Sequence, residues 1–101
     1  MFSACLALIG CRSLRDDVVG SYSFQSHSGL PYAPRTLVIT PGGAYKLTVG
    51  TALPEIGRWS PDDSRGDRIV LNNGVYPVHR VFGAVKIVMN GDEGEEFVKA
   101  R

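Results

Sequence analysis

Cysteine is scarce in this chain of 101 residues. The sequence holds only two, Cys5 and Cys11, and none after residue 11. No disulfide can therefore form within the segment from residue 12 to the end. Small domains outside the cytosol often depend on disulfides, because they bury a smaller fraction of their surface than large domains do. A domain in this segment must be held together by its apolar core and its backbone hydrogen bonds.

The sequence also lacks an excess of charge of either sign. Eleven basic and ten acidic side chains leave a net charge of +1. Proteins that bind nucleic acid usually carry a clustered basic surface. We therefore expect no nucleic-acid partner.

Motifs for catalysis, cofactors or metals are missing as well. The sequence contains no Ser/His/Asp set at a recognised spacing and no glycine-rich phosphate loop that leads into a helix. His27 and His79 are its only histidines and lie far apart in the chain, so their spacing does not predict a metal site. We expect a protein that is not an enzyme and that uses no cofactor.

The apolar run near the start of the chain is short. It covers residues 4–9, whereas a transmembrane helix needs roughly 20 apolar residues. The run ends in Leu8-Ile9-Gly10-Cys11, which resembles the lipobox at which bacterial lipoprotein signal peptides are cut. Gly10 is the small residue that the peptidase requires, and Cys11 supplies the thiol to which lipid is attached.

This resemblance implies that the protein is located in the bacterial cell envelope. Cys11 would be the lipidated first residue of the mature protein, with palmitate-type chains as its membrane anchor. Residues 1–10 would form the signal segment, residues 11–17 a polar tether, and residues 18–101 the folded domain. In enterobacterial lipoproteins an Asp directly after the cysteine retains the protein in the inner membrane. Arg12 occupies that position, which favours the outer membrane, facing the periplasm.

From Val18 onward the sequence consists of short β-rich runs separated by glycine-containing turns. Tyr45, Leu47 and Val49 alternate with polar residues, which is typical of a strand with one buried face and one wet face. We expect eight strands, at residues 18–25, 36–40, 44–50, 55–60, 68–72, 75–82, 85–90 and 95–99. The turn-rich spacing predicts an all-β antiparallel meander that is closed or curled into a small barrel. A two-layer β-sandwich is the alternative.

The chain resembles small bacterial lipoproteins that carry a lipocalin-like barrel. The resemblance extends distantly to the N-terminal domain of the copper-resistance and envelope-stress lipoprotein family. The motifs that carry it are Val19-Gly20-Ser21-Tyr22, the hairpin over residues 37–47, Gly57-Arg58-Trp59-Ser60 and Ile69-Val70-Leu71-Asn72. The copper-resistance branch has a Cys-x-x-Cys in its first long loop, which this chain lacks, so copper binding is not implied.

Two functions remain open from the sequence. The first is a non-enzymatic module that binds another envelope protein, through the loop that contains Leu30, Pro31 and Tyr32, because binding residues are often found on loops of rigid scaffolds. The second is a lipocalin-type carrier of a small apolar ligand, with a cavity lined by Tyr22, Trp59 and Phe82. A filled barrel would favour the first function, and an enlarged interior would favour the second.

Overall fold

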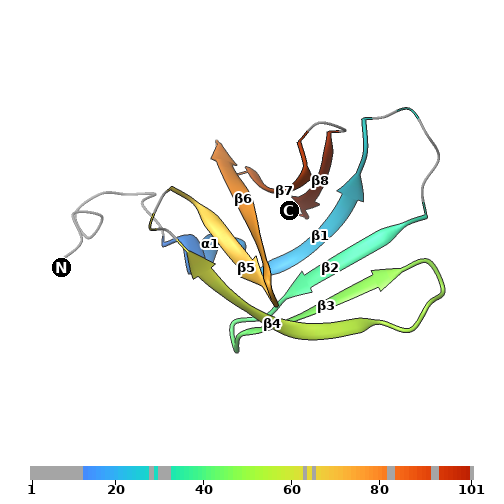
Figure 1. Ribbon diagram of the computed structural model, residues 1–101, viewed down its shortest axis with the longest axis horizontal. Helices are drawn as coiled ribbons and strands as arrows, with labels where there is room; N and C mark the ends of the chain where they lie inside the picture. Colours follow the sequence, from blue (N-terminus) through green and yellow to red (C-terminus); the bar gives the residue numbers. More distant parts are fainter. Residues whose placement is uncertain are drawn as a thin grey trace.

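The computed structural model shows a closed barrel of eight antiparallel strands with one short helix (Figure 1). The structure describes residues 13–27, 29, 33–62, 64, 66–81, 84–91 and 94–100. The elements are α1 (Leu14–Val18), β1 (Gly20–Gln25), β2 (Arg35–Ile39), β3 (Ala44–Val49), β4 (Glu55–Asp62), β5 (Arg68–Leu71), β6 (Gly74–Val81), β7 (Ala84–Asn90) and β8 (Glu95–Lys99). Each strand pairs with the next along the chain, and β8 pairs with β1 to close the barrel. The predicted all-β meander is confirmed as a barrel rather than a sandwich.

β4 shows how the strands are staggered around the barrel. Its first half pairs with β3, from Leu47↔Glu55 to Ala44↔Arg58, and its second half pairs with β5, from Trp59↔Leu71 onward. A closed barrel requires such a stagger because its strands are tilted relative to the barrel axis. The pairing of β7 with β8 also shifts in register between Val88 and Asn90, as a β-bulge does where a strand bends.

The core consists of the inward-facing residues of the strands together with two residues of α1. In β1, β2, β5 and β7 buried residues alternate with more exposed ones, as the period of a strand requires. The buried residues of the core are Leu14, Val18, Tyr22, Phe24, Leu37, Ile39, Tyr45, Trp59, Ile69, Leu71, Val78, Val85, Ile87 and Phe97.

The structure differs from the sequence-based expectation before β1. The expected tether ends at residue 17, but the chain from Ser13 onward is folded against the barrel, and Val18 ends a helix rather than beginning a strand. The Ser13 side chain caps α1 by accepting a hydrogen bond from the Asp16 N–H at 3.2 Å. Leu14 is 6% exposed and Val18 is fully buried. Burial of these two side chains in the core explains why this segment is not a free tether.

Polar contacts fix the position of α1. The carboxylate of Asp17 accepts a hydrogen bond from Arg80 Nη1 at 2.9 Å, and Arg80 also forms a bidentate pair with Asp67. Lys99 Nζ donates to the backbone oxygen of Asp17 at 2.6 Å. Gly20 makes this contact possible, because a Cβ at that position would lie 2.7 Å from Lys99 Cε. The helix is thereby joined to β6 and β8, which are distant in sequence.

We predict that Leu14→Ala lowers the free energy of unfolding by about 2–4 kcal/mol, because it leaves a cavity between α1 and the barrel. Leu53→Ala is the matched control, since Leu53 is 94% exposed, and its effect should stay within about 0.5 kcal/mol. Denaturant unfolding of both variants measures the difference. Equal stabilities would mean that residues before β1 do not belong to the core.

Candidate functional site

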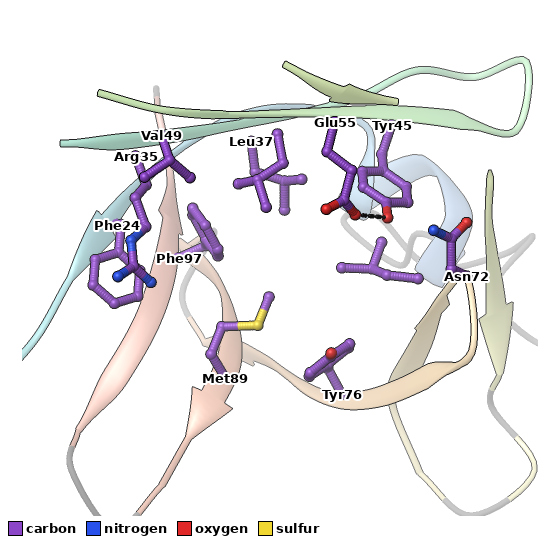
Figure 2. Close-up of a pocket in the computed structure, with 12 residues that line it drawn as sticks. Phe24, Arg35, Leu37, Tyr45, Val49, Glu55, Asn72, Tyr76, Met89 and Phe97 are labelled. Atoms are coloured by element: carbon purple, nitrogen blue, oxygen red, sulfur yellow. Dashed lines mark hydrogen bonds between the residues drawn. The ribbon is translucent and has the colours of Figure 1, made fainter. Parts of the chain in front are cut away.

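A pocket of about 260 Å³ lies inside the barrel (Figure 2). Its walls come from strands on all sides of the barrel, toward the strand ends that are remote from α1. Phe24 and Met89 lie near the ends of β1 and β7, and Arg35 and Glu55 begin β2 and β4. The residues that line it are Phe24, Arg35, Leu37, Tyr45, Leu47, Val49, Glu55, Leu71, Asn72, Tyr76, Met89 and Phe97.

The alternation of the strands explains which residues reach the pocket. On β3 the lining residues are Tyr45, Leu47 and Val49, at every second position. On β4 the same rule places Glu55 in the pocket wall and Trp59 in the core, with Gly57 between them. A Cβ at Gly57 would lie 2.6 Å from Cε1 of Tyr45. The glycine therefore makes room for the tyrosine ring in the pocket wall.

One wall of the pocket carries a hydrogen-bonded pair. The hydroxyl of Tyr45 donates to Oε2 of Glu55 at 2.5 Å (Figure 2). Desolvation by burial raises the pKa of Tyr45 to about 12, and the hydrogen bond and negative charge of Glu55 act in the same direction. Tyr45 is therefore a neutral donor at physiological pH. Beside it, Asn72 Oδ1 accepts the backbone N–H of Arg58 at 3.1 Å.

The wall formed by β1 and β2 carries a positive charge. The guanidinium of Arg35 lies over the ring of Phe24, 4.4 Å from its centroid. The ring of Phe24 in turn meets Phe97 edge-on, at a centroid distance of 5.4 Å. Within the described part of the chain, Arg35 Nε is buried and has no hydrogen-bond partner. This arrangement presents a cation against an aromatic surface at the edge of an apolar space.

The rest of the lining is apolar. It includes Leu37, Leu47, Leu71, Val49 and Met89. Of these, Leu37 lies between Arg35 and the Tyr45–Glu55 pair (Figure 2). A mostly apolar lining with a few placed polar groups is typical of small-molecule sites. The volume falls slightly below the range of about 300–1,000 Å³ that drug-sized ligands need. The pocket is therefore suited to a small ligand.

The sequence-based prediction of a cavity named residues other than those that line this pocket. Tyr22 and Trp59 are buried in the core next to α1 and do not line this pocket. The Tyr22 hydroxyl donates to the backbone oxygen of Val18 at 2.6 Å, and Trp59 Nε1 donates to the backbone oxygen of Thr40 at 2.7 Å. Both side chains thus serve the packing of α1 and of the β2–β3 turn. Phe82, the third predicted residue, lies outside the described residues.

Other predicted site residues also lie outside the described part of the chain. These are the lipobox residues Leu8, Ile9 and Gly10, the lipidation residue Cys11, and Leu30, Pro31 and Tyr32 of the expected partner loop. Their predicted roles stay predictions.

The described residues contain no group of three or more His, Cys, Asp or Glu side chains that could hold a metal ion. In the same part of the chain, no helix has the length and apolar character needed to cross a membrane. Comparison with known proteins found no matching family model, no matching curated protein and no matching solved structure.

We predict that ionisation of the Tyr45 hydroxyl lowers the free energy of unfolding at alkaline pH. Its pKa is raised from 10.0 to about 12 in the folded protein. The stabilisation is therefore fully present below the unfolded-state pKa and is lost as pH rises from 10.0 to about 12. Denaturant unfolding across this pH window should show a smaller loss of stability for Tyr45→Phe than for the natural protein. Parallel losses would show that the hydroxyl of Tyr45 is not held neutral by its surroundings.

Proposed function

We propose that this protein is a non-enzymatic binding protein that takes a small, mostly apolar ligand into the barrel pocket. The observation that carries the proposal is the interior space of about 260 Å³ with an apolar lining and polar groups on two walls. A barrel interior that served only as a core would be packed to crystal-like density, with few voids larger than a water molecule.

The volume sets the size of the ligand. An engineered cavity of about 150 Å³ binds benzene, which has six carbon atoms. By proportion, the present pocket holds a ligand of roughly ten non-hydrogen atoms. A single medium-length chain or one substituted ring fits this limit, whereas a long-chain lipid would extend outside the barrel.

The alternative function, binding of another envelope protein through Leu30, Pro31 and Tyr32, stays a prediction from the sequence. These residues lie outside the described part of the chain, so the geometry adds no support to it. The pocket supports the ligand carrier, which is the function that we propose.

We predict that the protein binds 1-octanol, a neutral probe of suitable size, and that Leu47→Trp removes this binding. Leu47 is partly buried against the core and lines the pocket, so an indole at this position occupies the space of the ligand. Leu53→Trp is the matched control because Leu53 is exposed. Isothermal titration calorimetry should detect binding to the natural protein and to the control variant only. Absence of heat with the natural protein, or unchanged binding to Leu47→Trp, would contradict the proposal.

We also propose that the barrel is attached to a bacterial membrane through a lipid on Cys11. The support is the lipobox-like sequence Leu8-Ile9-Gly10-Cys11. Each buried methylene of a lipid chain contributes about 0.8 kcal/mol, and two or more chains are enough for a stable anchor. The barrel then needs no membrane-binding face of its own.

The intact mass of protein extracted from membranes tests this anchor. We predict a chain that begins at Cys11 and carries added acyl groups, and we predict that Cys11→Ala, expressed from the same gene, is neither cut nor acylated. An unmodified mass that retains residues 1–10 would contradict the anchor and leave the pocket proposal unaffected.

A further inference from the structure

The charge of Arg35 indicates which head group the ligand carries. Among the described residues that line the pocket, it is the only one with a cationic side chain. Its guanidinium contacts the face of Phe24, and a cation–π contact satisfies none of its N–H donors. Within the described residues, no salt bridge involves Arg35, whereas Arg68, Arg80 and Lys86 each pair with a carboxylate.

The carboxylate in the pocket does not neutralise Arg35. Glu55 accepts a hydrogen bond from Tyr45 rather than from Arg35, and Glu55 is exposed to water. A buried donor that has lost water without gaining a partner is unfavourable, and more so when the group is charged. Arg35 lines the pocket, and none of the salt bridges among the described residues neutralises its guanidinium, so an anion on the ligand would supply the missing charge partner.

We propose that the ligand is a single-chain amphiphile whose carboxylate binds Arg35 and whose alkyl chain lies along Leu37, Leu47 and Met89. This inference rests on the proposed ligand-binding function. A guanidinium binds a carboxylate through parallel N–H···O bonds, which are stronger than bonds between neutral groups. The guanidinium carbon of Arg35 lies over the ring of Phe24, and this contact uses none of the N–H donors that would bind the ligand carboxylate.

Glu55 limits the charge of the ligand. Its carboxylate also lines the pocket, on the far side of Leu37 from Arg35 (Figure 2), and it repels a second negative charge on the ligand. The pocket thus selects a monoanion over a dicarboxylate. The size limit of roughly ten non-hydrogen atoms corresponds to a chain such as octanoate.

Calorimetric titration with octanoate, 1-octanol and octylamine tests this inference at neutral pH. The three probes share the alkyl chain and differ in the charge of the head group. We expect octanoate to bind more tightly than 1-octanol, by about tenfold to a hundredfold, and octylamine to bind most weakly. Suberate, a dicarboxylate with the same number of carbons, should bind less tightly than octanoate.

Two arginine variants assign the effect to one residue. Arg35→Met keeps an unbranched side chain and removes the charge, so it should lose the preference for octanoate while still binding 1-octanol. The retained 1-octanol binding shows that this variant is folded. Arg58→Met is the matched control, because Arg58 is an exposed residue of β4 outside the pocket lining. It should bind both probes as the natural protein does.

The outcomes separate the two proposals. Equal binding of octanoate and 1-octanol by the natural protein would overturn the carboxylate assignment and leave the pocket function standing. An equal loss of octanoate binding in both arginine variants would also overturn it, since net charge rather than Arg35 would then be responsible. Failure of all four probes to bind the natural protein would overturn both proposals.

Discussion

Closure of the barrel is the constraint on which the rest of this structure depends. The pairing of β1 with β8 gives every strand two neighbours, so the sheet has no free edge and encloses one interior. The inward residues of eight tilted strands must then either fill that interior or leave a defined space. In this protein they do both, with a packed region next to α1 and a pocket toward the other ends of the strands.

The short helix determines where the packed region lies. Leu14 and Val18 enter the core, and burial of a side chain of this kind contributes about 1.5–3 kcal/mol. The ion pair between Asp17 and Arg80 is partly exposed, and such pairs contribute about 0.2–1 kcal/mol. Apolar burial therefore holds α1 on the barrel, while Asp17, Arg80 and Lys99 fix its orientation. Because the interior next to α1 is filled in this way, the space for a ligand lies between Arg35 and Tyr45.

The sequence predicts the strands well because each carries a local signal. The alternation on β3 and the glycine-containing turn before it lie within a few neighbouring residues, and such patterns need no knowledge of the closed barrel. The helix was missed because five residues are too few for a helical period. Its signal was the cap, since Ser13 stands three residues before Asp16 and is followed by Leu14 and Val18 one turn apart.

The pocket was harder to predict because it depends on which inward residues fail to fill space. Aromatic content pointed to Tyr22 and Trp59, but the stagger of the strands places both beside α1. Arg35 was missed because the expected strand began one residue later, at Thr36. In the observed register Arg35 shares the inward face with Leu37 and Ile39. A charged residue at an inward position of a strand, such as Arg35, is the sequence signal from which a site in the barrel interior can be predicted.

A ligand site inside the barrel is tested most directly by NMR spectroscopy of the protein with methyl-labelled leucine and methionine, in the presence of 1-octanol. We expect intermolecular nuclear Overhauser effects from the alkyl chain to the methyl groups of Leu37, Leu47 and Met89, and none to those of the exposed Leu53. Effects confined to Leu53, or none at all, would contradict a binding site inside the barrel.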